Sequence, residues 1–388
     1  MQKICFVISD DNYLISHRSS LIAELNRANK SITVATKITD FSLKEKIEKL
    51  GCNIFDLKVR ASKIGLIKNV KLLFLLIYHF NNSDSDIVAA YSIRMVFLSL
   101  IAFKFSRAKK FVGTITGFGN LETSRKTSVK LIKKVVLKIL KLLLAAKNTT
   151  IIVQNRDDYQ FVKANLIDPE RTALILGSGV DINSYKPQPE PISDTIVVTV
   201  VSRMLKDKGI LESVAAIKIL YDAGLNVCLQ LVGDVFLENP ASLSALEMKK
   251  ISELPFVHWL GFRKDINEVW ENSHIALLAS YREGLPKCLL EAASCGRPIV
   301  TTDVPGCSEV VKHGVNGYLV PAKSSQGISD AIIKLIDDKN LRLKMGNESR
   351  KMVEQHFADK IINKQTIDFF QGTRYFCLSD NELSRGNQ

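Results

Sequence analysis

Short apolar runs recur along this chain with stretches of helical periodicity between them, and this alternation most constrains its fold. The stretch HRSSLIAELNRA at 17–28, for example, carries apolar residues at helical spacing. A repeated order of strand, helix and strand predicts a parallel sheet with helices on both faces. The apolar runs of the first half lie at 4–9, 31–36, 86–91, 110–116 and 150–155.

A loop with three prolines, KPQPEPISD at 186–194, interrupts the alternation. The chain of 388 residues is also long for one ordinary core. We therefore predict two doubly wound α/β domains, 1–185 and 186–355, then a helix at 356–371 that returns to the first domain and a tail at 372–388. Ligands of such sheets bind at the carboxyl ends of the strands, which predicts a cleft between the domains. The later apolar runs lie at 195–203, 226–234, 274–280, 298–303 and 317–322.

The first half of the chain carries the whole surplus of basic residues. Residues 1–190 hold 30 Lys and Arg against 16 Asp and Glu, whereas the remainder holds 23 against 24. The segment 124–148 predicts a basic amphipathic helix, which is typical of contact with an anionic membrane surface. A core-packed helix with a solvated lysine face is the alternative. The segment 63–80 could add a second membrane contact, and no nucleic-acid motif accompanies the charge. The lysines at helical spacing are Lys126, Lys130, Lys134, Lys138 and Lys141.

The cysteines and the apolar runs indicate a compartment. Seven cysteines without a CxxC pair argue against a zinc site or a disulfide framework, and favour a reducing cytoplasm. The opening MQKICFVISDD predicts a buried strand, not a signal peptide. Because the apolar runs are shorter than the roughly 18 residues that span a bilayer, we expect a cytoplasmic protein, peripheral on the inner face of the membrane.

The stretch YREGLPKCLLEAASCGRP at 281–298 holds two glutamates, Glu283 and Glu291, around a Gly-Leu-Pro turn. Its position predicts a turn after the strand at 274–280 and a helix that begins near Pro286. Backbone N–H groups at a helix start favour an anion, and carboxylates accept bonds from hydroxyl groups. The stretch therefore predicts a site for a polyhydroxylated, phosphorylated ligand.

The same stretch resembles the E-x7-E signature of glycosyltransferase family 4, whose members are retaining transferases of the GT-B architecture. Three further segments resemble the family: VSRMLKDKG at 201–209, GSGVD at 177–181 and TTDVPGCSEVVKHGVNGYLVP at 301–321. The resemblance implies two Rossmann-like domains that face each other across a cleft. It also implies transfer of a sugar, with a UDP-sugar as the donor, to a lipid-linked saccharide or polysaccharide acceptor in bacterial surface-glycan synthesis.

The resemblance also implies roles for individual residues. Glu283 would bond hydroxyls of the transferred sugar and Glu291 the ribose hydroxyls. Arg203 and Lys208 would hold the diphosphate and stabilise its developing charge, with no metal or other cofactor. The remaining donor-site residues would be Gly284, Leu285, Pro286, Lys287 and, beside the base, Phe262.

The amino-terminal domain departs from the family pattern. Its first loop lacks a glycine pair, yet YLISHR resembles a subfamily variant in which His17 and Arg18 would face the acceptor or the phosphates. Core or helix-capping roles for the two remain open. Where many relatives carry a histidine, this chain has GTITGFGN, so Thr116 and Gly117 would lie at the acceptor.

Two other functions and one possible metal motif are alternatives to a metal-independent glycosyltransferase. A nucleotide-sugar epimerase shares the architecture, and a catalytically silent scaffold could keep the fold. A scaffold is expected to lose Glu283, Glu291, Arg203 or Lys208, all of which are present. The DSD motif at 84–86 precedes a strand instead of following one, which predicts a solvated turn and no metal site.

Overall fold

The computed structural model describes residues 1–58, 65–118, 127–236 and 239–373, and it divides into two compact units. The first unit comprises Met1–Ser178 and the segment from Ile361 onward, and the second comprises Gly179–Lys360. The sequence placed this boundary at 185. In the structure the boundary lies after Ser178. The Val180 N–H donates to the Phe357 carbonyl and the Asp359 N–H to the Val180 carbonyl, both at 3.0 Å. These bonds join 179–185 to the second unit.

The first unit contains a seven-stranded parallel sheet in the order β3-β2-β1-β4-β5-β6-β7. Its strands are β1 (Lys3–Val7), β2 (Ser31–Thr36), β3 (Asn53–Asp56), β4 (Ile87–Tyr91), β5 (Lys110–Ile115), β6 (Thr149–Val153) and β7 (Thr172–Leu174). Its helices are α1 (Asp11–Arg27), α2 (Phe41–Lys49), α3 (Leu66–Asn82), α4 (Ile93–Phe103), α6 (Thr127–Leu144), α7 (Arg156–Asn165) and α14 (Asp359–Gln371).

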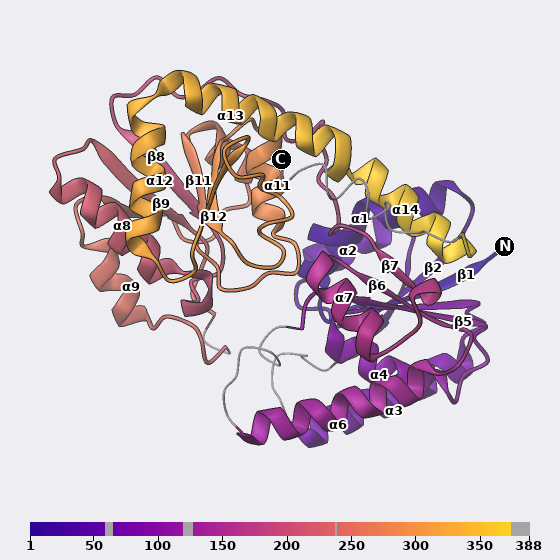
Figure 1. Ribbon diagram of the computed structural model, residues 1–388. Coiled ribbons are helices and arrows are strands. Elements are labelled where there is room, and N and C mark those ends of the chain that lie inside the picture. The colour runs from indigo at the N-terminus through magenta and orange to yellow at the C-terminus, as the bar shows by residue number, and fades with distance from the viewer. Residues whose placement is uncertain (59–64, 119–126, 237–238, 374–388) are drawn as a thin grey trace. The chain divides into compact units, whose positions relative to one another are not determined.

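Helices cover both faces of this sheet, and each face has its own apolar core. One core joins the strands to α3, α4, α6 and α7, and the other joins them to α1, α2 and α14 (Figure 1). Helix α1 begins six residues before the predicted helix. The Asp10 carboxylate caps it by accepting the Tyr13 N–H at 2.9 Å, and an acidic cap of this kind stabilises a helix start.

The last helix, α14, packs against the sheet of the first unit. Phe370 lies 6.2 Å from Phe6 of β1, between ring centroids. The Lys110 ammonium donates to the carbonyls of Phe369 and Phe370 at 2.8 and 3.0 Å, at the end of α14 where helix carbonyls lack partners. The chain therefore leaves the first unit at residue 178 and re-enters it at residue 361.

The second unit contains a six-stranded parallel sheet in the order β10-β9-β8-β11-β12-β13. Helices α8, α9 and α12 share one apolar core with its strands (Figure 1). Helix α11 contacts α10 and α13. The strands are β8 (Ile196–Val201), β9 (Val227–Val232), β10 (Val257–Trp259), β11 (Ile275–Leu278), β12 (Ile299–Thr302) and β13 (Gly317–Val320). The helices are α8 (Ile210–Asp222), α9 (Ala245–Ser252), α10 (Ile266–Glu271), α11 (Lys287–Ser294), α12 (Ser325–Asp337) and α13 (Lys339–Met352).

The strand order reverses between β1 and β4 in the first sheet and between β8 and β11 in the second. Loops diverge at such a switch point, which is where doubly wound sheets bind ligands. Among the described residues, no helix is both long and apolar enough to span a bilayer.

Candidate active site

The side chains of Lys208 and Glu283 meet at the switch point of the second sheet. Lys208 ends a 3-10 turn at Lys206–Lys208 after β8, and Glu283 lies in the turn between β11 and α11. The Lys208 Nζ forms an ion pair with Glu283 Oε1, and the two side chains are only 19% and 12% exposed. Burial lowers the pKa of Lys208, but the Glu283 carboxylate more than offsets this, so the net pKa is raised. The ammonium group is therefore charged at neutral pH.

Close backbone contacts fix the two loops against each other. The Tyr281 N–H donates to the Asp207 carbonyl at 2.9 Å, and the Tyr281 hydroxyl donates to Glu212 at 2.6 Å. Gly209 has φ +69°, and a Cβ atom there would lie 2.1 Å from the Ala279 carbonyl oxygen. Glycine is therefore required at 209 for the Lys208 loop to approach β11 so closely.

The proline-glycine turn after β12 supports the backbone of Glu283. The Glu283 N–H donates to the Pro305 carbonyl at 3.2 Å. A Cβ atom on Gly306 would lie 2.7 Å from the carbonyl oxygens of both Glu283 and Gly284. The segment 301–321 thus contacts the E-x7-E stretch directly.

Glu291 lies in the second turn of α11, on the same helix as Lys287. Pro286 is the N-cap of α11 and Lys287 its first residue, one position later than the predicted start. Lys287 Nζ lies 4.0 Å from Glu291 Oε1. Burial raises the pKa of Glu291, partly offset by Lys287 and by a hydrogen bond from the Tyr185 hydroxyl. Gly284 and Leu285 are half-buried in the turn that precedes the helix.

Arg203 extends into solvent beside the Lys208–Glu283 pair. It follows β8, lies over the Phe236 ring with its guanidinium carbon 5.3 Å from the centroid, and is close enough to act on the pKa of Lys208. Within the described ranges no carboxylate forms an ion pair with Arg203. Lys208 is therefore paired with a carboxylate in this site, whereas Arg203 is available to an anionic ligand.

Phe262 lies in the loop after β10, joined to its neighbours through Asp234. The Phe262 N–H donates to Asp234 Oδ1 at 3.1 Å, and the Met204 N–H donates to the Asp234 carbonyl at 3.0 Å. The Phe262 side chain is 63% exposed. The loops after β8, β9 and β10 thus form a continuous edge that ends in an exposed aromatic ring.

The predicted acceptor residues lie in α1 and directly after β5 of the first unit. His17 stacks on Tyr13 with ring centroids 4.3 Å apart, and Arg18 is buried against Tyr91. Thr116 and Gly117 follow β5, where Gly117 has φ +115°. Each predicted residue therefore lies at the carboxyl edge of one of the two sheets or in a helix that follows it.

Tyr185 lies next to Glu291, although no motif in the sequence points to it. Its hydroxyl bonds to Glu291, and burial followed by that carboxylate raises the pKa of Tyr185. Ser294 donates to the Tyr185 carbonyl at 2.6 Å and Arg350 at 2.7 Å, which holds the tyrosine on α11. Its only sequence signal is its position next to the proline-rich loop.

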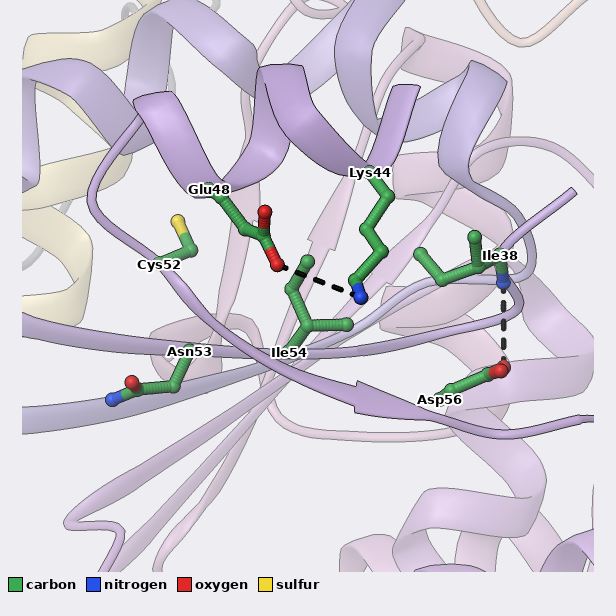
Figure 2. A pocket seen from close by; sticks show the side chains of 7 residues that line it. All are labelled: Ile38, Lys44, Glu48, Cys52, Asn53, Ile54 and Asp56. Atoms are coloured by element: carbon green, nitrogen blue, oxygen red, sulfur yellow. Dashed lines mark hydrogen bonds and ion pairs between the residues drawn. The ribbon is translucent and has the colours of Figure 1, made fainter. Parts of the chain in front are cut away.

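The DSD motif and a pocket of the first unit do not belong to this site. Asp84 and Asp86 pair with Lys3 and Lys109 ahead of β4, as a solvated turn would. The structure contains a pocket of about 400 Å³ between α2 and β3 in the first unit, partly bridged by the Lys44–Glu48 ion pair (Figure 2). It contains no predicted site residue, and in the described part of the chain no three His, Cys, Asp or Glu side chains are arranged to hold a metal.

Residues 181–352 match the protein family described as Glycosyl transferases group 1. The chain is 27% identical over 311 residues to the capsular polysaccharide biosynthesis glycosyltransferase CapM of Staphylococcus aureus, covering 77% of this chain and 80% of that one. It is 29% identical over 318 residues to the UDP-Gal:alpha-D-GlcNAc-diphosphoundecaprenol alpha-1,3-galactosyltransferase of Escherichia coli, covering 78% and 79%.

Solved structures resemble the whole fold. Anabaena Alr3699/HepE in complex with UDP and glucose has a TM-score of 0.75 at 21% identity, covering 96% of this chain and 100% of that one. WaaG, a glycosyltransferase involved in lipopolysaccharide biosynthesis, has a TM-score of 0.72 at 15% identity, covering 95% and 100%.

The two parallel sheets and these similarities define the class of the protein: it is a glycosyltransferase with two Rossmann-like domains of the GT-B fold. The predicted pair of parallel-sheet α/β domains and the glycosyltransferase class are confirmed. The segment 181–352, which is similar to the group 1 glycosyltransferases, contains Arg203, Lys208, Glu283 and Glu291.

Proposed function

We propose that this glycosyltransferase moves a sugar from a UDP-sugar to a lipid-linked saccharide during synthesis of a bacterial surface glycan, with retention of the anomeric configuration. The names of its relatives support both substrates, since one is described by UDP-Gal and a diphosphoundecaprenol acceptor. Another relative is described by capsular polysaccharide biosynthesis.

The observation that carries this proposal is the Lys208–Glu283 ion pair beside Arg203. Without a donor, each charge of the pair neutralises the other. When the diphosphate of a donor binds to Lys208 and Arg203, the Glu283 carboxylate becomes available to accept hydrogen bonds from sugar hydroxyls. The site would thus exchange an internal ion pair for two bonds to opposite ends of one ligand.

The same arrangement would assist the reaction. The bond from the anomeric carbon to the diphosphate oxygen breaks, an acceptor hydroxyl oxygen forms the new bond to that carbon, and the hydroxyl proton passes to the leaving diphosphate. Negative charge develops on the leaving diphosphate, where Arg203 and Lys208 would stabilise it. We assign no protein nucleophile to this step, and the proposal requires no metal.

Further contacts would complete the donor site. The backbone from Gly284 through Lys287 precedes and begins α11, a position that favours phosphate. Glu291 would accept bonds from the ribose hydroxyls, and the exposed ring of Phe262 would lie beside the base. His17, Thr116 and Gly117 would contact the acceptor.

The test replaces Lys208 by Met, with Lys206→Met as its matched control. Lys206 lies two residues away in the same turn but pairs with Glu247 at the surface, at 3.1 Å. UDP at about 100 times its Kd should stabilise the wild type by roughly 2.7 kcal/mol. Loss of one charge-assisted bond should weaken UDP binding roughly 10- to 100-fold in Lys208→Met and leave Lys206→Met unchanged.

Three outcomes would contradict the proposal. Equal UDP binding by Lys208→Met and the wild type would remove Lys208 from the donor site. Release of a free altered sugar nucleotide, with no labelled sugar on a diphosphate-linked saccharide, would favour an epimerase. A folded protein that binds no UDP, GDP, ADP or their sugar conjugates would favour a scaffold.

We also propose that the first unit docks on an anionic membrane through α3 and α6. Lys134, Lys138 and Lys141 of α6 are exposed, whereas Lys126 and the side chain of Lys130 lie outside the described residues. Large apolar side chains are also exposed on both helices, which suits a headgroup surface. The exposed apolar residues of the two helices are Ile67, Val70, Phe74 and Tyr78 in α3, and Val135, Ile139 and Leu142 in α6.

The membrane proposal is tested with the triple variant Lys134→Glu, Lys138→Glu, Lys141→Glu. Each lysine near an anionic surface contributes about 1 kcal/mol, so binding to anionic vesicles should weaken roughly 100-fold or more. The control carries Lys249→Glu, Lys250→Glu and Lys264→Glu, the same charge change at exposed positions of the second unit. Equal loss in both variants, or unchanged binding in the first, would contradict docking through α6.

A further inference from the structure

Arg18 lies on the buried face of α1, where the helical pattern predicts apolar residues. It is 3% exposed, and its neighbours along the buried stripe are apolar. The buried residues of α1 are Asp11, Leu14, Arg18, Leu21, Ile22 and Leu25. A permanently charged guanidinium among them requires an explanation, because buried charges in proteins are normally paired.

No carboxylate pairs with Arg18 in the part of the chain that the structure describes. The two acids at the start of α1 are engaged elsewhere: Asp10 Oδ1 accepts the Tyr13 N–H at 2.9 Å. Asp11 accepts both the N–H and the hydroxyl of Thr39 at 2.6 Å. The local acids thus stabilise backbone and leave the guanidinium charge without a partner.

Aromatic groups supply all the interactions of this guanidinium that the structure describes. Its carbon lies 4.4 Å from the centroid of the Tyr91 ring, and Nη2 donates a long bond of 3.3 Å to the Tyr13 hydroxyl. The Nε–H is enclosed and has no hydrogen-bond partner. Ring faces orient a cation but accept few of its five N–H bonds, so the donors of Arg18 remain largely unused.

The position of Arg18 is that of a ligand site. Tyr91 is the last residue of β4, next to β1, where the strand order of the first sheet reverses. Tyr91 pairs with Thr114 of β5, and Thr116 and Gly117 follow on the same edge. The unpaired cation therefore lies at the topological switch point, where such sheets bind ligands.

We propose that Arg18 marks an anion site in the first unit that takes a phosphate group of the diphosphate-linked acceptor. This inference rests on the proposed function for the identity of the acceptor. The forked guanidinium matches two oxygens of one phosphate, and its stacking on Tyr91 fixes the plane of the fork before the ligand arrives. Arg18 belongs to the first unit, whereas Arg203 and Lys208 of the proposed donor diphosphate site belong to the second.

The first experiment titrates inorganic pyrophosphate into protein saturated with UDP, so that the donor site is occupied. The wild type should bind pyrophosphate. Arg18→Met, which keeps the aliphatic body of the side chain, should bind it roughly 10- to 100-fold more weakly. Arg27→Met, an exposed arginine in the last turn of the same helix, is the control and should bind like the wild type.

The second experiment separates acceptor phosphate from free phosphate. Transfer is compared between a diphosphate-linked saccharide and the same saccharide as an alkyl glycoside. Arg18→Met should raise the KM of the diphosphate-linked acceptor roughly 10- to 100-fold, with the KM of UDP-sugar and of the alkyl glycoside unchanged. An unchanged KM together with weakened pyrophosphate binding would restrict the site to free phosphate and overturn the acceptor assignment.

Other results would overturn the anion site itself. These are equal pyrophosphate binding by Arg18→Met and the wild type, an equal loss in Arg27→Met, or no pyrophosphate uptake by UDP-saturated wild type. If Arg18→Met does not fold, pyrophosphate binding is compared between the wild type and Arg18→Lys. Equal binding by these two would also overturn the anion site. Failure of the proposed transferase function would leave the pyrophosphate titration readable, so the two failures are distinguishable.

Discussion

At the scale of single residues, the carboxylate of Glu291 links ligand binding to pH. Burial raises its pKa, so the folded protein takes up this proton at a higher pH than the unfolded chain does. The stability due to this proton is complete below the unfolded pKa and is lost as pH rises through the folded pKa. Ionised Glu291 would accept hydrogen bonds from the ribose hydroxyls. A lower pH, which stabilises the fold through this residue, should therefore weaken donor binding.

Glu291→Gln tests this link. UDP-glucose is the suitable ligand, because its phosphate groups keep a constant charge from mildly acidic to neutral pH. Wild-type affinity should fall as pH drops through the raised pKa of Glu291, and the Gln variant should bind weakly with little pH dependence. Glu253→Gln, at an exposed position, is the control. A pH profile of Glu291→Gln that parallels the wild type would exclude Glu291 as its source.

At the scale of elements, the approach of the Lys208 turn to β11 depends on Gly209. Alanine there meets the Ala279 carbonyl oxygen at 2.1 Å and also keeps an unfavourable positive φ. We expect Gly209→Ala to destabilise the second unit by about 3 kcal/mol or more and to abolish UDP binding, because Lys208 and Glu283 separate.

Gly224 offers the matched control for this prediction. It has φ +81°, and a Cβ atom there meets nothing within 4 Å. Gly224→Ala should therefore cost only about 1 kcal/mol from backbone conformation and should bind UDP normally. Denaturant unfolding and UDP titration of both variants measure the difference. Comparable losses in the two would mean that the φ angle, not the contact with β11, governs the site.

At the scale of the whole molecule, α14 ties the end of the described chain to the first unit. Phe370 is 3% exposed and packs near Phe6. Phe370→Ala should destabilise the first unit by about 3 to 5 kcal/mol, as for other buried phenylalanines. Phe41→Ala removes a ring that is 71% exposed and should have little effect.

Calorimetry with and without UDP checks this assignment. UDP should raise the unfolding temperature of the second unit, which holds the proposed donor site, in both Phe370→Ala and the wild type. Phe370→Ala should lower the unfolding temperature of the first unit, which does not respond to UDP. A lowered UDP-sensitive transition would show that α14 supports the second unit instead, contrary to its contacts with Lys110 and Phe6.

The chain sequence by itself determined the repeated order of strand and helix, because periodicity is local and each strand buried on both faces is apolar. All ten predicted apolar runs coincide with strands. The strands it missed, β3, β7 and β10, are short and lie at sheet edges. An edge strand has one neighbour and less apolar burial, so its pattern is weaker.

Only the tertiary structure decided which distant residues meet and which charges are buried. Lys208 and Glu283 are 75 residues apart, and their ion pair exists because β8 and β11 are neighbours in the sheet. The burial of Arg18 against Tyr91 likewise depends on β1 lying beside β4. Spacing along the chain reports one helix or one strand at a time, whereas strand order brings separate loops to a single edge.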